Sequence, residues 1–144
     1  IYSRSLEIKI LLNNEMRIKV IESLIKKNNL EVFIDFNFLN LTPGNFLLFN
    51  KICEENKIDI DGEFLENLKI LLNLYKKNKN INLISMILFL TDYHFYNIQE
   101  KKNNNIEQII EDKFFVISNI NKFIAYNLNQ NSLINAINNK LSNG

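Results

Sequence analysis

Residues 106–124, IEQIIEDKFFVISNINKFI, decide the fold class of this chain. Apolar side chains recur in this stretch at steps of three and four positions, which places them along one side of an α-helix. The stripe consists of Ile106, Ile109, Ile110, Phe114, Ile117, Ile120 and Ile124. The stretch therefore predicts a helix that buries one face against other helices.

Similar patterns flank this helix on both sides. Asp61 is expected to cap a preceding helix, whose apolar side lies between Phe64 and Tyr75. The polar run KKNKN at 76–80 then leads to residues 83–95, which are apolar on more than one face and predict a central helix. A last helix follows NLNQN at 127–131. Four helices joined by short polar loops predict an antiparallel bundle or an orthogonal array.

The first 58 residues predict a smaller helical unit that follows a strand. Residues 5–10 alternate apolar and polar side chains, as in a half-buried strand, and no partner strand follows, so its sheet is expected upstream of Ile1. Asn14 is expected to cap a helix with a stripe from Met16 to Ile25. The stretch EVFIDFNFLNL at 31–41 is interpreted as a short helix because its neighbours are helical. Thr42 predicts an N-cap and Pro43 the first position of the next helix.

The composition narrows the function classes. Hydrophobic residues at 47% and charged residues at 23% are typical of a globular chain, and three glycines with one proline are too few for an all-β fold. A formal charge of +1 gives no net field to attract a polyanion. One cysteine and one histidine form no zinc set, and no metal site is expected. Without a membrane-length apolar run or a signal-peptide layout, we expect a cytoplasmic location with no membrane partner.

Motifs that carry chemistry are absent from the sequence. It contains no phosphate-binding loop, no dinucleotide fingerprint and no H-E-x-x-H. His94 is interpreted as a helix-edge histidine, and Cys53 as a small core residue with no base beside it. Glu54-Glu55 and Glu111-Asp112 are adjacent on helices and therefore diverge, which favours a solvated face over a carboxylate pair. An enzyme that is complete within these residues is not expected, and no cofactor is assigned to this chain.

Three short motifs, Ser3-Arg4-Ser5, Thr42 to Leu47 and residues 127–134, follow one another along the chain, and in this order they resemble bacterial clamp-loader subunits of DNA polymerase III. Ser3-Arg4-Ser5 before the strand is similar to the Ser-Arg-Cys motif ahead of the last strand of their ATPase (AAA+) core. Thr42-Pro43-Gly44-Asn45-Phe46-Leu47 resembles the Ser-Pro-Gly-Arg-Ala-Leu-like segment that opens the last helix of their lid domain. Residues 127–134, NLNQNSLI, resemble the segment that opens the final helix of the delta-prime subunit.

The resemblance implies an all-α chain with one residual strand from a missing ATPase core. Residues 1–10 would be the last core strand, residues 11–58 the helical lid, and residues 59–144 the helical collar through which the family forms a hetero-pentamer. Its partners would be the other clamp-loader subunits through the collar, and the sliding clamp and primer-template DNA through the complex.

The same resemblance assigns roles to single residues. Arg4, supported by Ser3 and Ser5, would be an arginine finger that reaches the ATP-Mg²⁺ of a neighbouring subunit. Asn45, next to Pro43 and Gly44, stands where active members carry a sensor arginine, and an amide supplies no such charge. This departure favours the delta-prime type, which does not hydrolyse ATP itself.

Two other function classes stay open. A small helical adaptor without a catalytic role would use the same helices as protein-binding surfaces, with Arg4 as an ordinary surface charge. A helical nucleic-acid-binding domain would use lysine pairs such as Lys26-Lys27 and Lys76-Lys77, although such pairs at helix ends often act as C-terminal caps or solvated charge.

Overall fold

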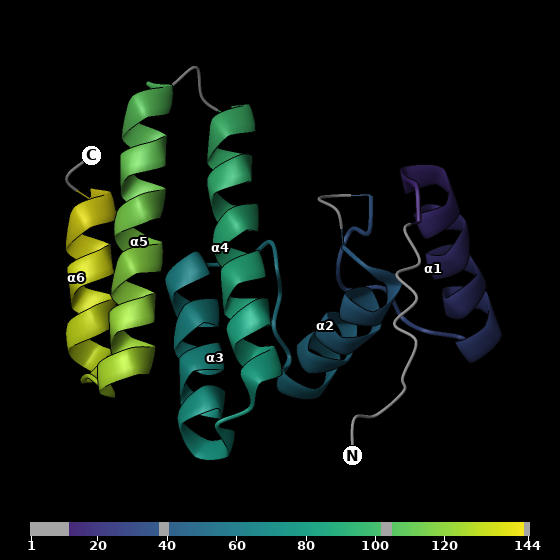
Figure 1. Cartoon of the computed structure of the whole chain (residues 1–144), viewed down its shortest axis with the longest axis horizontal. Coiled ribbons are helices and arrows are strands. Elements are labelled where there is room, and N and C mark those ends of the chain that lie inside the picture. Colours follow the sequence, from purple (N-terminus) through teal and green to yellow (C-terminus); the bar gives the residue numbers. More distant parts are fainter. Residues whose placement is uncertain (1–11, 38–40, 102–104, 143–144) are drawn as a thin grey trace, which may run out of the picture. The chain divides into compact units, whose positions relative to one another are not determined.

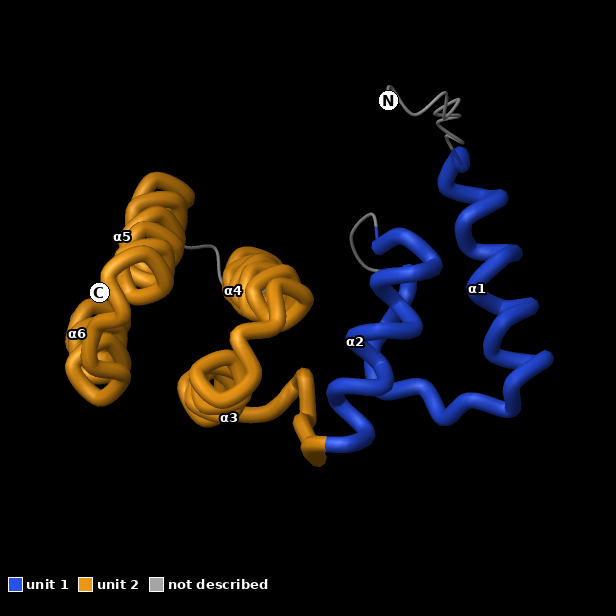
Figure 2. Tube along the Cα trace, turned by 60° about the horizontal axis from the view of Figure 1, so that its bottom comes forward, with its two compact units in different colours: residues 1–55 blue, residues 56–144 orange. Residues whose placement is uncertain are grey.

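The computed structural model describes residues 12–37, 41–101 and 105–142. All regular elements in these ranges are α-helices, which confirms the all-α class (Figure 1). The strand expected over residues 5–10 lies outside the described residues. The chain divides into two compact units, residues 1–55 and 56–144 (Figure 2), whereas the sequence predicts the boundary between residues 58 and 59.

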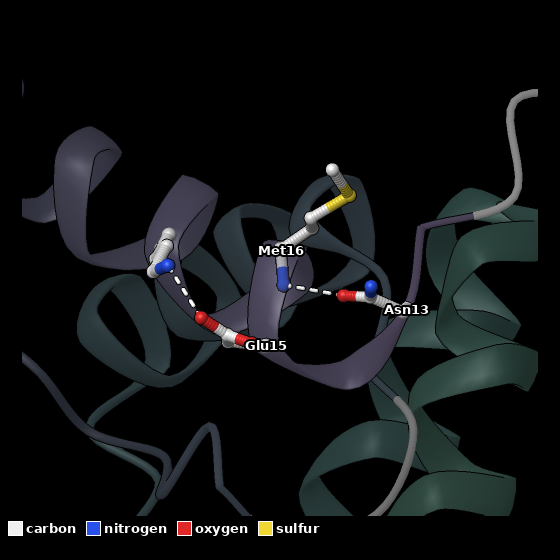
Figure 3. Close-up of polar contacts among 4 residues, drawn as sticks. Asn13, Glu15 and Met16 are labelled. Carbon is white, nitrogen blue, oxygen red and sulfur yellow. Dashed lines mark hydrogen bonds and ion pairs between the residues drawn. The ribbon is translucent and has the colours of Figure 1, made fainter.

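Unit 1 contains helices α1 (Asn14–Asn28) and α2 (Pro43–Asn56). The N-cap of α1 is Asn13, whose Oδ1 accepts a hydrogen bond from the Met16 amide at 2.8 Å (Figure 3). The prediction of Asn14 as the cap was therefore wrong by one residue. The apolar stripe of this helix is also narrower than expected, because Met16 and Val20 are exposed and Ile21 is its one fully buried apolar side chain.

The segment between the two helices is not helical where the structure describes it, at residues 30–37 and 41–42. The short helix predicted over 31–41 was therefore wrong. Asn50 of α2 replaces part of the missing backbone pairing: its Oδ1 accepts from the Phe33 amide at 2.8 Å, and its Nδ2 donates to the Glu31 carbonyl at 2.6 Å. Ile34 and Leu41 of this segment are buried, whereas Val32 is 45% exposed.

Arg17 of α1 donates hydrogen bonds to the same segment. Its guanidinium donates to the Phe36 carbonyl at 2.8 Å and to the Leu41 carbonyl at 3.1 Å, and twice to Oδ1 of Asn14. The residue is only 6% exposed. Two backbone oxygens and the side-chain oxygen of Asn14, rather than a carboxylate, therefore satisfy this buried cation.

Helix α2 begins as predicted. Thr42 precedes it and its Oγ1 accepts from the Asn45 amide at 3.2 Å, while Pro43 takes the first position, where its missing N–H is harmless. Phe46, Phe49 and Cys53 are buried, which confirms Cys53 as a core residue.

Unit 2 is an antiparallel bundle of the helices α3 (Phe64–Asn78), α4 (Ile81–Lys101), α5 (Ile106–Tyr126) and α6 (Gln130–Ser142). Consecutive helices pack on each other and α6 returns to α3, so the four helices close a ring around one core (Figures 1 and 2). The Gln130 side chain reinforces this closure by donating to the Lys69 carbonyl at 3.2 Å.

The core of unit 2 is built from aliphatic side chains that are almost completely shielded from solvent. Each contributes roughly 1.5–3 kcal/mol by leaving water. They come from all four helices: Leu68, Leu71, Leu72, Met86, Ile87, Leu90, Val116, Ile120 and Ile137. Helix α4 contacts α3 and α5, but each helix of the ring likewise contacts two others, so these contacts do not give α4 the central position expected for an all-round apolar helix.

The polar turn before α3 does not act as a simple cap. The N-cap of α3 is Glu63, which makes no side-chain capping bond, so the prediction of Asp61 in that role was wrong. Asp59 organises the turn: its Oδ1 accepts from the Asp61 amide at 3.1 Å, and its carbonyl accepts from the Gly62 amide at 3.0 Å and from Asn67 Nδ2 at 2.5 Å. Asp61 is thereby directed to another partner, the Tyr93 hydroxyl.

Four residues at helix ends or directly after them adopt the left-handed conformation without being glycine. They are Asn29, Lys57, Lys79 and Asn127, with φ between 49° and 54°. Asn29, Lys79 and Asn127 close α1, α3 and α5, and the Lys79 amide donates to the Tyr75 carbonyl at 2.7 Å. None of the glycines that the structure describes has a positive φ.

Candidate functional site

The residues assigned by resemblance fall into two groups. Ser3, Arg4 and Ser5 lie outside the described residues. Pro43, Gly44 and Asn45 form the first turn of α2, where Asn45 is exposed and its amide bonds to Thr42. A Cβ added at Gly44 would meet no atom within 4 Å, so this fold does not require glycine there.

A cavity of about 660 Å³ lies within unit 2. Its walls come from the turn at 60–63, the start of α3, the second half of α4, the first half of α5 and Leu141 of α6. Pockets of roughly 300–1,000 Å³ are the usual size for ligand sites. The cavity is therefore the first candidate for a binding site in this chain.

His94 stands in the wall of this cavity. Its ring stacks on Phe64 with 4.2 Å between the ring centroids and meets Phe95 edge-on at 5.2 Å. Burial lowers the pKa of His94 to about 4, because desolvation disfavours the imidazolium. The histidine is neutral at pH 7 and is packed among aromatic rings, so the interpretation as a helix-edge histidine missed its half-buried position.

The polar part of the wall is acidic. Asp61, Glu63 and Asp112 line the cavity, and no lysine or arginine does so among the residues that the structure describes. Asp61 accepts a hydrogen bond from the Tyr93 hydroxyl. Among the described lining residues, the neutral histidine and the carboxylates of Asp61 and Glu63 offer no positive charge to a phosphate group.

Asp112 corrects one sequence interpretation. Glu111 is exposed, as expected for a solvated face, but Asp112 is only 8% exposed. Its Oδ1 accepts from Gln108 Nε2 at 2.8 Å and lies 3.1 Å from Lys140 Nζ of α6. The spacing of Gln108 and Asp112 by four positions was visible in the sequence, whereas the approach of α6 was not.

A second feature of unit 2 is an exposed apolar row on α5. Ile106, Ile110 and Phe114 are 58%, 62% and 74% exposed and follow one another at steps of four along one side of the helix. The sequence stripe placed all three in a buried face, which was wrong. We call these three residues the α5 row.

Metal and membrane sites receive no support. Among the described residues no group of three or more His, Cys, Asp or Glu side chains is arranged to hold a metal ion. Among the helices that the structure describes, none combines the length and hydropathy of a bilayer-spanning segment. Comparison of the chain with protein-family models, curated proteins and solved structures finds no match.

Proposed function

We propose that this chain is the C-terminal part of a clamp-loader subunit of the delta-prime type, which takes part in DNA replication without hydrolysing ATP. The observation that carries the proposal is the order of its parts. A small helical unit whose helix α2 opens with Thr42-Pro43-Gly44 precedes a closed four-helix bundle. In the proposal the first unit is the lid and the bundle is the collar.

The start of α2 supports the non-hydrolysing role. Asn45 exposes a neutral amide in the first turn, at the position where the resemblance expects a sensor arginine. Helix N-termini attract anions, but an amide adds no positive charge to stabilise a γ-phosphate. A subunit with this residue would depend on its neighbours for ATP turnover.

The α5 row supports a role in assembly. Solvent-exposed apolar side chains that line up along one helix are typical of surfaces that pack against a partner. The collar function requires such a surface on the bundle, and the α5 row supplies one. The other subunits of the complex are the partners that the proposal assigns to it.

Arg4 is the proposed catalytic contribution to the complex. A guanidinium inserted into the neighbouring subunit's ATP site would stabilise the charge that develops on the γ-phosphate, and fingers of this kind contribute about 10³- to 10⁵-fold in rate. Replacing Arg4→Ala in the full gene product, within a reconstituted complex, should lower ATP hydrolysis at that site and slow clamp loading on primed DNA. The subunit should still co-purify with the complex.

Two further variants make this test specific. Lys9→Ala removes a positive charge five positions along the chain and should leave the ATPase rate unchanged. Arg4→Lys keeps the charge without the planar fork and should rescue little. An ATPase rate of Arg4→Ala equal to that of the unsubstituted complex would reject the finger role.

The same α5 row also favours a second candidate, a helical adaptor with no link to replication. An adaptor would bind its partner through this row without any affinity for clamp-loader subunits. Co-expression with the remaining subunits, followed by size-exclusion chromatography, separates the two functions. Co-elution supports the clamp-loader assignment, and a chain that elutes alone supports the adaptor.

A further inference from the structure

The cavity of unit 2 combines open volume, aromatic walls and uncompensated acidic groups. About 660 Å³ of space, partly open to solvent, lies between the turn at 60–63 and helices α3 to α6. This volume is larger than one side chain needs, so a ligand can enter together with water or with neighbouring parts of the same molecule. The chemistry of the wall then determines which ligand fits.

The charge of the wall selects a cation. Asp112 is compensated, because Lys140 lies 3.1 Å from its Oδ1. Asp61 and Glu63 form no ion pair with any lysine or arginine that the structure describes, and both are exposed at the turn beside the cavity. Two carboxylates therefore remain available to a positively charged ligand.

The position of Asp61 is fixed before any ligand arrives. Its amide bonds to Asp59 Oδ1 at 3.1 Å, and its carboxylate accepts the Tyr93 hydroxyl. A carboxylate oxygen has more than one acceptor site, so the bond to Tyr93 leaves room for a second donor. Such preorganisation reduces the entropy lost on binding.

The aromatic part of the wall selects a flat cation. Phe64, His94 and Phe95 form a cluster of ring contacts at the cavity, in which Phe64 and Phe95 are buried and the half-buried His94 is the ring that can meet a ligand. Because desolvation keeps His94 neutral at pH 7, its ring adds no repelling charge. A guanidinium stacks on aromatic faces and pairs with carboxylates through its planar fork, whereas an ammonium is a compact, strongly hydrated charge.

We propose that this cavity is a binding site for an arginine side chain of a partner protein, held by Asp61 and Glu63 and stacked against the ring of His94. The site lies within the bundle and is independent of the α5 row and of Arg4. The proposal of an arginine site therefore does not rest on the proposed function, and the experiment below tests it separately.

The test is a titration of the ¹⁵N-labelled chain with a capped pentapeptide that carries one central arginine. Amide shifts of residues around the cavity should saturate with a dissociation constant on the order of 0.1–1 mM, as expected for a single partly exposed ion pair with stacking. The same peptide with citrulline, which keeps the shape and loses the charge, should not bind. Equal binding of both peptides would overturn the proposal.

Substitutions locate the site. Asp61→Asn and Glu63→Gln should each weaken arginine-peptide binding about three- to tenfold, and the amide oxygen introduced by Asp61→Asn can still accept the Tyr93 hydroxyl. Glu111→Gln removes the same charge from a residue outside the cavity and should leave affinity within about twofold. Unchanged affinity in both cavity variants, with unchanged melting temperatures, would refute the assignment.

Two further experiments test whether the peptide binds in the cavity and whether the site prefers arginine to other cations. Asn97→Phe fills the cavity without changing its charge and should abolish saturable binding, whereas retained binding would place the peptide elsewhere. A lysine peptide or spermidine should bind at least about fivefold more weakly than the arginine peptide. Equal affinity of either would overturn the choice of arginine.

Discussion

Replacing Arg17→Met should destabilise unit 1 more than any surface substitution on α1. The arginine makes four hydrogen bonds, two of them to the backbone oxygens of Phe36 and Leu41, and methionine keeps the aliphatic volume without any donor. A bond from a charged donor contributes roughly 1.5–3 kcal/mol, but the cost of burying the guanidinium offsets part of the sum. We expect a loss of about 3 kcal/mol, mainly because the Leu41 and Phe36 carbonyls lose their partner.

Urea denaturation followed by far-UV circular dichroism measures the loss, and hydrogen exchange locates it. The Phe33 amide, which is bonded to Asn50, reports on the 30–42 segment and should exchange faster in the variant. The matched control is Lys19→Met on the same helix. It removes an exposed pair with Glu15 at 2.5 Å, which contributes only about 0.3–0.5 kcal/mol.

A free energy of unfolding for Arg17→Met within about 0.5 kcal/mol of the control would refute this reasoning. Unchanged exchange at Phe33 would do the same for the 30–42 segment. Arg17→Lys is expected to fall between the two, since an ammonium can reach one carbonyl but lacks the fork that serves Asn14 as well.

Two predictions concern unit 2. The pKa of His94 is about 4 when folded and 6.5 when unfolded, so the unfolded chain binds the proton first as pH falls. The contribution of His94 to the free energy of unfolding is complete above pH 6.5 and declines by at most about 3 kcal/mol as the pH falls from 6.5 to 4. In His94→Phe this decline should be missing from a plot of the free energy of unfolding against pH, and parallel plots for the two proteins would contradict the prediction. Phe114→Ser should leave the melting temperature within about 2 °C, because the ring is 74% exposed, but weaken any assembly through the α5 row in sedimentation experiments; unchanged assembly would exclude the row as an interface.

Local signals in the sequence were sufficient for the parts of the fold that depend on neighbours in the chain. Three- and four-residue spacing identified the helices of the bundle, and Thr42 with Pro43 identified the start of α2, because capping involves residues within one turn. The small number of glycines was enough to favour an all-α chain over an all-β one.

The errors arise where a distant residue replaces a local bond. The 30–37 segment is not helical because Asn50 and Arg17, from helices on either side of it, take over backbone groups that a helix would have paired. Periodicity carries no information about such partners. Asp112 was interpreted as solvated for the same reason, since Lys140 reaches it only once α6 has packed.

The candidate sites were the least predictable part. An apolar stripe shows which residues share a helix face, but not which of them a neighbouring helix covers, so the exposure of the α5 row could not be read from it. The cavity depends on residues from the turn, α4 and α5 meeting in space. The sequence predicted Asp61 as a helix cap, whereas in the structure its carboxylate lies in the cavity wall and accepts the Tyr93 hydroxyl.

The left-handed residues at the helix ends have a consequence for the stability of this chain. At Lys57 and Lys79 a side chain occupies a conformation that costs roughly 1–2 kcal/mol relative to the right-handed one and that glycine adopts freely. Asparagine tolerates it better at positions 29 and 127. Because these ends lie in separate turns, the costs add up nearly independently. A change to glycine at the exposed Lys57 could recover this cost without altering the core, whereas at Lys79 it would also remove the contacts of the lysine with Tyr75 and Asn127.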